Sequence, residues 1–295
     1  MKILLTGRNG QLGFELRRAL APLAEVVALD SRTCDLADVN AVRRWVRDVR
    51  PAIIVNAAAY TAVDRAEGES DAAYAVNATA PGVLAEEAAA LGALMIHYST
   101  DYVFYGNKLS GAYDEEDIPC PLSVYGASKL AGEQAVMAAC QRHLILRTSW
   151  VVGVHGNNFA KTMLRLAAER DRLNVVADQW GAPTSAALLA DVTAHLLRQH
   201  SVREEGFPYG LYHVTAGGET NWHQYACHVI EYARAAGSHL RVPPEAIHPI
   251  PTSEYPTPAR RPQNSRLSTR KFQDTFGLRL PDWQDGVNHI LEQLI

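Results

Sequence analysis

The chain has 295 residues, of which 47% are hydrophobic and 20% are charged, a composition typical of a globular protein that buries its own core without disulfides. The 28 Lys and Arg against 32 Asp and Glu give a formal net charge of -4, which argues against a nucleic-acid-binding surface. The apolar runs are shorter than the roughly 18 residues that cross a membrane, and the N-terminus leads into glycine rather than a signal peptide, so we expect a cytoplasmic protein.

The cysteines and histidines are scattered rather than clustered. None of the four cysteines shows C-x-x-C spacing, and we expect reduced thiols that mainly serve packing. His223 and His228 lie five residues apart, whereas a helical metal-binding pair needs a spacing of four. We therefore expect no zinc site.

The first half of the chain, residues 1–150, alternates short apolar runs with longer amphipathic stretches, which is typical of βαβ units. The predicted strands are Lys2–Thr6, Val26–Leu29, Ile53–Val55, Leu94–Tyr98 and Leu144–Arg147. The predicted helices are Gln11–Leu20, Val39–Val49, Ala72–Leu91 and Tyr125–Cys140. The predicted fold class is α/β, a doubly wound parallel sheet (Rossmann fold), and residues 1–150 would form mainly an NAD(P)-binding domain.

The second half, residues 151–295, is less regular. Helices are expected at Asn158–Arg170 and Ser185–Gln199, with a strand near Val175. The prolines between Pro243 and Pro262 exclude a continuous helix there. A last helix is expected through Ile295, with Asp282 as its N-cap. We expect mainly a smaller C-terminal substrate-binding domain, with residues from about 175 to 215 returning to the Rossmann sheet.

A glycine-rich loop, Gly7-x-x-Gly10-x-x-Gly13, follows the first predicted strand and opens the first helix. In this arrangement, backbone N–H groups and the helix N-terminus can approach a pyrophosphate. Glycine spacing alone is a weak indicator, but its place between a strand and a helix favours a dinucleotide over a simple turn. The candidate contacts are Gly7, Asn9, Gly10, Gln11, Leu12 and Gly13.

The choice between NADH and NADPH stays open in the sequence. Asp30 ends the second strand about 20 residues beyond the loop, where a carboxylate can accept hydrogen bonds from the adenosine ribose, as in NAD enzymes. Arg32 can instead pair with a 2′-phosphate. Small side chains after the third strand suit close approach to a cofactor and suit tight packing equally well. The further candidate cofactor contacts are Asp35, Leu36, Ala57, Ala58 and Ala59.

Tyr125 and Lys129 lie four residues apart and share one face of a predicted helix. A phenol can donate a proton to a carbonyl oxygen whose carbon receives a hydride. A nearby ammonium is expected to lower the tyrosine pKa from about 10 toward the operating pH, and the lysine would also hold the nicotinamide ribose. Thr100 ends the fourth strand, where its hydroxyl reaches the same oxygen. The pattern predicts keto reduction, although Tyr-x-x-x-Lys alone also occurs on solvated helices.

Eight motifs are spread over nearly the whole chain: Thr6–Gly13, Asn56–Asp64, Ser99–Phe104, Tyr125–Lys129, Arg147–Trp150, Asn157–Lys161, Gly181–Thr184 and Arg261–Leu267. In this combination the chain resembles the extended short-chain dehydrogenases, and among them the reductases that act on nucleotide-linked 4-keto-6-deoxysugars.

The resemblance implies reduction of the C4 keto group of dTDP-6-deoxy-L-lyxo-4-hexulose to dTDP-L-rhamnose, with NADPH or NADH as cofactor. It implies that Tyr125 donates the proton, that Thr100 tunes this donor and binds the substrate oxygen, and that Lys129 holds the cofactor. It also implies a sugar pocket lined by Asp101, Tyr102 and Trp150.

The sugar and the diphosphate need different partners. Trp150 offers a flat apolar surface for a deoxysugar, although a tryptophan just after a strand is as often part of a core. Arg260 and Arg261 can pair with phosphate oxygens, the alternative being a solvated charge pair. Further candidates for polar contacts with the nucleotide are Asn157, Asn158 and Gln179.

Other functions share parts of this pattern. Dehydratases that resemble this chain need an Asp-Glu pair after the threonine, whereas Asp101 is followed by Tyr102. An epimerase stays open, and it would retain NAD tightly. A non-catalytic nucleotide-binding regulatory subunit, like the one that accompanies methionine adenosyltransferase, also keeps the tyrosine-lysine pair. Trp150 and Arg261 are the better discriminators against that class.

The oligomeric state also stays open between monomer and homodimer. Some bacterial proteins that this chain resembles hold a magnesium ion between subunits with acidic side chains. Glu15 and Asp191 are retained as candidate ligands, but Ala187 stands where a further acid is expected, which argues against a metal-bridged dimer. The expected partner is a small-molecule dTDP-sugar, with no nucleic acid and no membrane.

Overall fold

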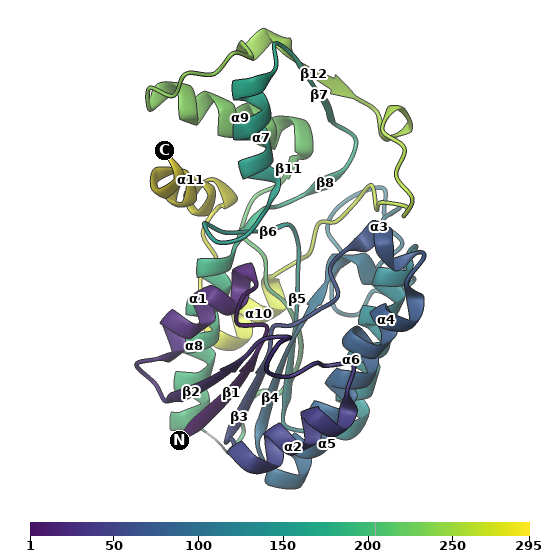
Figure 1. Cartoon of the computed structure of the whole chain (residues 1–295), viewed down its shortest axis with the longest axis vertical. Helices are drawn as coiled ribbons and strands as arrows, with labels where there is room; N and C mark the ends of the chain where they lie inside the picture. Colours follow the sequence, from purple (N-terminus) through teal and green to yellow (C-terminus); the bar gives the residue numbers. More distant parts are fainter. Residues whose placement is uncertain (204) are drawn as a thin grey trace.

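The structure is a computed structural model that describes residues 1–203 and 205–295, and it has two lobes (Figure 1). The larger, which we call the sheet lobe, is built on the parallel strands β1 (Lys2–Thr6), β2 (Glu25–Leu29), β3 (Ile53–Asn56), β4 (Leu94–Thr100), β5 (His143–Thr148) and β10 (Gly210–His213). Its helices are α1 (Gln11–Leu20), α2 (Val39–Val49), α3 (Val63–Ala66), α4 (Ser70–Tyr74), α5 (Ala80–Leu91), α6 (Val124–Ala139), α8 (Ala186–Val202) and α10 (Arg270–Phe276).

The strand order in the sheet is β10-β5-β4-β3-β1-β2, and every neighbouring pair is parallel. The order reverses between β1 and β3, so the chain winds in one direction on each side of that point. In sheets of this type, ligands bind in the crevice beyond the carboxyl ends of the strands at such a reversal. The predicted doubly wound Rossmann fold is confirmed.

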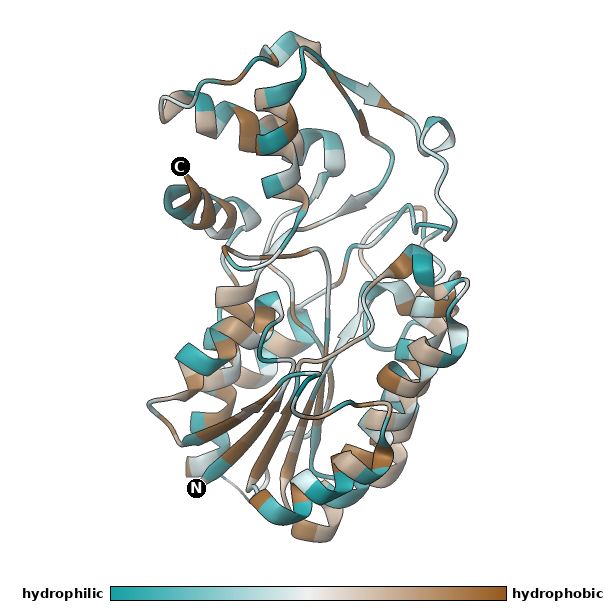
Figure 2. Cartoon of the chain, in the orientation of Figure 1, coloured by the Kyte–Doolittle hydropathy of each residue, from teal (hydrophilic) through white to brown (hydrophobic). Residues whose placement is uncertain are grey.

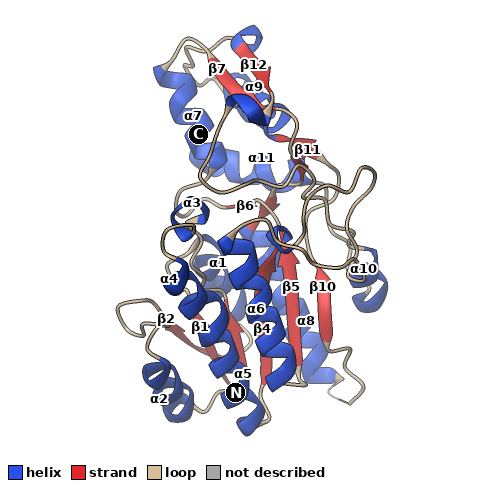
Figure 3. Ribbon diagram, turned by 90° about the vertical axis from the view of Figure 1, so that its right-hand side faces the viewer, coloured by secondary structure: helices blue, strands red, loops and turns tan. Residues whose placement is uncertain are grey.

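The strands form because their side chains are buried on both faces. β3 and β4 are buried at every residue, and a continuous apolar run suits a sheet that is covered on both sides. Figure 2 shows the central strands as the most continuously hydrophobic part of the sheet lobe. One face packs against α1, α8 and α10, and the other against α2, α5 and α6 (Figure 3).

The second group of elements, which we call the small lobe, gathers around its own core. Its helices are α7 (Phe159–Glu169), α9 (Trp222–Ala235) and α11 (Trp283–Leu294). Its short strands pair β12 (Ile247–Ile250) with β7 (Leu173–Val176) and β11 (Thr220–Asn221) with β8 (Trp180–Gly181). Near the junction, β6 (Val151–Val152) pairs with β9 (Thr184–Ser185).

One local prediction was wrong. The stretch Ala72–Leu91 is not one α-helix, because five residues of π-helix, Ala75–Thr79, separate α4 from α5. Asp282 is the N-cap residue of α11, as predicted, although its side chain makes no capping hydrogen bond there. The Asp282 carboxylate instead lies close to Gly217: a Cβ added at Gly217 would be 2.9 Å from Asp282 Oδ1.

The cysteines are free thiols, and within the described residues no cluster of three or more His, Cys, Asp or Glu is arranged to hold a metal. The expectation that the cysteines and histidines are merely scattered was wrong for Cys227 and His223, which lie four residues apart on α9 with 3.7 Å between Sγ and Nε2. Within residues 1–203 and 205–295, no helix is both long enough and apolar enough to cross a membrane.

Candidate active site

The motifs of the first half converge at the carboxyl edge of the sheet, on the side that faces the small lobe. Thr6, Asn56, Thr100 and Thr148 each end a strand of the parallel sheet. Because parallel strands end at the same edge, the loops that follow them meet there. The candidate site therefore lies between the two lobes (Figure 1).

The glycine-rich loop is packed too tightly for side chains at two of its positions. Gly7 has a positive φ of 77°, and a Cβ there would lie 2.7 Å from the backbone nitrogen of Ala58. A Cβ on Gly13 would lie 2.0 Å from the carbonyl oxygen of Gly7. Gly10 caps α1 without any side-chain hydrogen bond, which leaves the helix N-terminus available to an anion. This cradle fits a dinucleotide pyrophosphate.

Asp30 lies beside the loop and is held as a carboxylate. Its Oδ1 accepts hydrogen bonds from the Thr33 backbone and side chain and from the Arg32 backbone, and these lower its pKa. Its Oδ2 accepts from Asn9 at 3.1 Å and lies 3.7 Å from the Arg8 guanidinium. The Arg8 Nε is buried without a hydrogen-bond partner, whereas the Arg32 side chain is exposed.

The other loop residues join the two lobes. Gln11 donates to the carbonyl of Val151 at 3.2 Å and accepts from the amide of Asn158 at 3.0 Å. Asn158 also caps α7, while Asn157 beside it is exposed. Asn158 thus lies next to the glycine-rich loop, and neither asparagine is among the residues that line the cavity around Arg260 and Arg261.

The remaining cofactor candidates differ in burial. Leu12 and Leu36 are buried in the cores on opposite faces of the sheet, and Asp35 is exposed, with its carboxylate accepting from Ala37 N–H. The three alanines after β3 are partly buried, and Ala58 lies against Gly7: Ala57, Ala58 and Ala59.

Tyr125 and Thr100 meet at the end of β4. Tyr125 lies in the first turn of α6, whose N-cap is Ser123, and Thr100 caps the short 3-10 turn Asp101–Val103. Burial raises the pKa of Tyr125 to about 12, and the Thr100 hydroxyl lowers it. The expectation that Lys129 lowers this pKa was wrong for the structure, because burial outweighs the other influences on the phenol.

Lys129 lies one turn further along α6 and is almost wholly buried. Its ammonium donates a hydrogen bond to the Tyr98 carbonyl at 2.7 Å. Burial lowers the pKa of Lys129 to about 8, and the charge of Glu133 on the next turn opposes this shift. The carboxylate of Glu133 itself accepts hydrogen bonds from Nε and Nη2 of Arg147, at 2.8 and 2.7 Å.

Asp101 and Tyr102 lie beside the tyrosine. Asp101 is buried, its Oδ1 accepts from Thr100 at 3.1 Å, and its Oδ2 has no hydrogen-bond partner. Burial raises the pKa of Asp101 to about 6. The Tyr102 ring contacts the Tyr125 ring edge-on, with 5.5 Å between centroids. A buried carboxyl with one unsatisfied oxygen next to a phenol is the kind of polar group that orients a ligand.

Trp150 has a strained backbone. Its φ of 47° lies in the left-handed region, which is rare for a bulky residue. Its ring stacks on Trp222 with 3.7 Å between centroids. Gly181 makes room for it, since a Cβ there would lie 2.8 Å from the indole. Strain of this kind is held by surrounding contacts and is common at functional sites.

Gln179 is committed to the protein itself. Its Oε1 accepts from the Trp222 indole at 3.1 Å, and its Nε2 donates to Thr252 at 3.0 Å. Both ends of the amide thus serve to hold Trp222 and the segment that carries Thr252.

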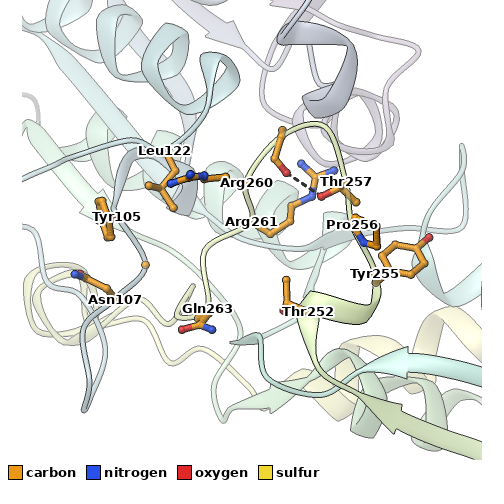
Figure 4. Close-up of a pocket in the computed structure, with 12 residues that line it drawn as sticks. Tyr105, Asn107, Leu122, Thr252, Tyr255, Pro256, Thr257, Arg260, Arg261 and Gln263 are labelled. Atoms are coloured by element: carbon orange, nitrogen blue, oxygen red, sulfur yellow. Dashed lines mark hydrogen bonds between the residues drawn. The ribbon is translucent and has the colours of Figure 1, made fainter.

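A cavity of about 450 Å³ opens between the two lobes (Figure 4). Arg260 and Arg261 line it, with Tyr105 and Tyr255 among the other lining residues. Arg261 Nη2 pairs with Asp64 Oδ2 at 2.6 Å, and its Nη1 is buried without a partner. The Asn56–Asp64 and Arg261–Leu267 motifs therefore meet through an ion pair, which leaves one guanidinium nitrogen for a ligand.

The two candidate magnesium ligands, Glu15 and Asp191, are bridged by Arg18 instead. Its guanidinium donates to Glu15 Oε2 and to Asp191 Oδ1, each at 3.0 Å. The two carboxylates therefore already share one positive charge, that of the Arg18 guanidinium, on the surface formed by α1 and α8.

Several residues of the site were not predicted from the sequence. Trp222 follows the N-cap Asn221 of α9 and has no local pattern that distinguishes it from a core tryptophan. His97 lies within a buried strand and has the pattern of a packing residue. Arg8 lies directly after Gly7 in the glycine-rich loop, and a basic residue at that place could have indicated a contact with a cofactor phosphate.

Comparison with known proteins agrees with this geometry. The family described as RmlD substrate binding domain matches residues 1–295. The chain is 53% identical over 298 residues to the dTDP-4-dehydrorhamnose reductase of Shigella flexneri, covering 100% of this chain and 98% of the relative.

Two solved structures have nearly the same fold. A dTDP-4-dehydrorhamnose reductase from Clostridium acetobutylicum has a TM-score of 0.91 and 37% identity, covering 100% of this chain and 99% of that one. The enzyme from Bacillus anthracis in complex with NADP has a TM-score of 0.90 and 36% identity, covering 99% of each chain. This chain belongs to the dTDP-4-dehydrorhamnose reductase family.

Proposed function

We propose that this protein reduces the C4 keto group of dTDP-4-dehydro-L-rhamnose to dTDP-L-rhamnose, the last step of dTDP-rhamnose biosynthesis, with NADPH or NADH. The full-length similarity to reductases of this name supports the substrate. The observation that carries the mechanism is the meeting of Tyr125 with Thr100 at the edge of the sheet, one helical turn from Lys129.

The cofactor would lie across the glycine-rich loop. Gly7, Gly10 and Gly13 would leave its pyrophosphate close to the backbone and to the N-terminus of α1. With NADH, Asp30 would accept hydrogen bonds from the ribose hydroxyls. With NADPH, the 2′-phosphate would pair with Arg8 and Arg32. When bound, the nicotinamide supplies a hydride to the C4 carbon of the sugar.

Tyr125 would donate the proton. As hydride reaches the carbonyl carbon, negative charge develops on the oxygen, and the phenol protonates it. Thr100 would donate a hydrogen bond to the same oxygen, and the charge of Lys129 would favour the phenolate that is left. A phenol whose pKa is raised to about 12 needs this help, since an isolated buried phenolate is costly.

The rest of the substrate would lie toward the small lobe. Asp101, Tyr102 and Trp150 would surround the sugar, and Arg260 with Arg261 would bind the diphosphate in the cavity beside them. In this proposal residues 151–295 are mainly the substrate-binding part, and residues from about 175 to 215 contribute α8 and β10 to the sheet lobe.

The location and the assembly follow from the same proposal. We place the enzyme in the cytoplasm, where NADPH and NADH are regenerated. The bridge that Arg18 makes between Glu15 and Asp191 favours a working unit without intersubunit magnesium, either a monomer or a dimer held by other contacts.

The test is oxidation of NADPH or NADH with freshly generated dTDP-4-keto-6-deoxysugar and its 3,5-epimerase. We expect substrate-dependent turnover, and Tyr125→Phe should lower kcat by roughly 10² to 10⁴-fold because it removes the general acid and little packing. Tyr225→Phe is the matched control, since the Tyr225 hydroxyl is buried without a partner in the small-lobe core. A fully active Tyr125→Phe enzyme would reject the assignment of the proton donor.

A further inference from the structure

His97 forms a buried link between the catalytic lysine and the cofactor loop. Its side chain is 0% exposed on β4, and its Nε2 lies 3.3 Å from the Lys129 ammonium. We propose that His97 is a positioning residue: as a neutral imidazole, it accepts a hydrogen bond from Lys129 and holds the ammonium where it serves Tyr125 and the cofactor ribose. The role of Lys129 in this inference rests on the proposed function.

The link continues on the far side of the imidazole. His97 Nδ1 lies 3.0 Å from the Asn56 side-chain amide, and the Thr6 hydroxyl donates to Asn56 Oδ1 at 2.5 Å. The Ala58 N–H donates to Thr6 Oγ1 at 3.3 Å, beside Gly7. Asn56 and Thr6 are as deeply buried as His97. The ends of β1 and β3 and the middle of β4, three neighbouring strands, are thus tied to α6.

The imidazole is suited to this position because it stays neutral. Burial and the neighbouring ammonium lower the pKa of His97 well below its ordinary value. A neutral imidazole has one donor and one acceptor nitrogen. When Nε2 accepts from the ammonium, Nδ1 carries the proton and needs an acceptor, which the Asn56 oxygen provides once the amide is turned by 180°.

The same residues also serve the neutral amine. With the amide as it lies in the structure, Asn56 donates to Nδ1, and Nε2 then donates to the uncharged Nζ. The direction of this hydrogen-bond chain therefore follows the charge of Lys129. In both states every buried polar atom between Lys129 and Thr6 keeps a partner, which avoids the cost of an unsatisfied group.

Lys129 has few other polar neighbours. The Tyr98 carbonyl of β4 accepts from it, Glu133 lies one turn along α6, and Tyr125 lies one turn before it. Glu133 is engaged by Arg147 of β5, which in turn lies 3.5 Å from His213 of β10. His97 is therefore the side chain whose loss most directly removes a partner from the ammonium.

The experiment compares His97→Leu with His97→Gln, which places an amide oxygen near the position of Nε2. Two quantities are measured against pH: kcat, and the Kd of NADP⁺ from quenching of tryptophan fluorescence. Loss of His97 removes a hydrogen bond from both forms of Lys129, but the bond to the charged ammonium is the stronger one, so the pKa of Lys129 falls. In His97→Leu we expect the alkaline limb of both profiles to move about one pH unit lower, so that kcat falls roughly fivefold at about pH 8 and roughly tenfold at about pH 9. In His97→Gln we expect the wild-type limb and kcat within about threefold.

Thr193→Val controls for the loss of a buried hydrogen bond as such. Thr193 is fully buried on α8 and pairs with the side-chain hydroxyl of Tyr98, whereas the Lys129 ammonium bonds to the backbone carbonyl of that residue. The Thr193→Val substitution should lower Tm without moving the alkaline limb of kcat or of the Kd of NADP⁺. A folded His97→Leu protein with wild-type limbs would overturn the proposal, as would a His97→Gln protein with limbs as displaced as those of His97→Leu. If the sugar nucleotide is not turned over but the NADP⁺ limb moves as expected, the substrate assignment fails and the positioning role stands.

Discussion

The reacting residues are side chains that burial pushes away from their ordinary protonation. Burial raises the pKa of Tyr125 to about 12 and that of Asp101 to about 6, and it lowers the pKa of Lys129 to about 8. Each shift favours the neutral form of the group. Keeping three such groups together costs stability, and their persistence side by side at one sheet edge is typical of a site selected for chemistry.

Asp101 allows this cost to be measured. Its pKa is raised from 3.8 to about 6, so the folded protein binds the proton more tightly than the unfolded chain does. The stabilising effect of the proton is complete below the unfolded pKa and is lost as pH rises through about 6. Above that pH the buried carboxylate costs on the order of 3 kcal/mol.

Asp101→Asn removes the ionisable carboxyl, so the variant should lack the loss of stability that ionisation of Asp101 causes as pH rises through about 6. Relative to wild type, we expect the variant to gain roughly 2 kcal/mol in free energy of unfolding between about pH 4.5 and about pH 8, measured by urea denaturation. The same variant should lose affinity for the sugar nucleotide. Parallel stability curves for the two proteins would contradict the shifted pKa, whatever the offset between them.

At the scale of elements, the helix that the sequence predicted over Ala72–Leu91 is interrupted by Pro81. A proline lacks the N–H that would bond to the carbonyl four residues before it, here that of Asn77. The chain instead forms π-helix over Ala75–Thr79, with Ala80 N–H bonded to the Ala75 carbonyl. The Asn77 carbonyl faces α6 at Gly132, and the Asn77 side chain bonds to Ser128 and Tyr60.

Gly132→Ala tests this contact between helices. In most helix interiors, alanine stabilises relative to glycine by up to about 1 kcal/mol. Here a Cβ would lie 2.0 Å from the Asn77 carbonyl oxygen, and backbone cannot give way cheaply. We expect a loss of roughly 3 kcal/mol or more in the free energy of unfolding and a lower kcat, because α6 carries Tyr125 and Lys129.

The control is Gly68→Ala, at a position where the nearest atom to an added methyl group is the Arg65 carbonyl oxygen at 3.9 Å. It should change the free energy of unfolding by less than about 1 kcal/mol. If both substitutions prove equally mild, the close approach of α6 to the π-helix does not constrain the fold.

This contrast also shows what the sequence could predict. The strands β1, β3 and β4 and the loop after β1 follow from local apolar runs and glycine spacing, so they were predicted nearly residue for residue. The π-helix instead depends on Pro81, which cannot bond to the Asn77 carbonyl, and on α6, which packs against that carbonyl at Gly132. The site partners Asp64 with Arg261, and Trp150 with Trp222, are far apart in the chain, and no local period brings them together.

At the scale of the whole molecule, two lobes with separate cores are joined by specific contacts. Gln11 and Asn158 join the cofactor loop to α7, Asp64 pairs with Arg261, and the chain crosses between lobes at Trp150. The strained φ of Trp150 costs of order 1–3 kcal/mol, which surrounding contacts must offset. The stack on Trp222, fixed in turn by Gln179, is the most direct of these contacts.

Trp222 belongs to the small lobe, and the cofactor loop belongs to the sheet lobe, so a change at Trp222 should separate substrate binding from cofactor binding. In Trp222→Leu, Trp150 loses its stacking partner and Gln179 loses its donor. Stacking of this kind contributes about 0.5–1.5 kcal/mol, so we expect KM for the sugar nucleotide to rise roughly 3- to 10-fold while the Kd of NADP⁺ stays within about twofold.

Trp222→Phe keeps a ring but not the indole N–H, so it distinguishes the stack from the hydrogen bond to Gln179. An unchanged KM in Trp222→Leu would mean that Trp150 holds its position without Trp222. Equal losses of substrate and cofactor affinity would mean that the two lobes respond as one unit.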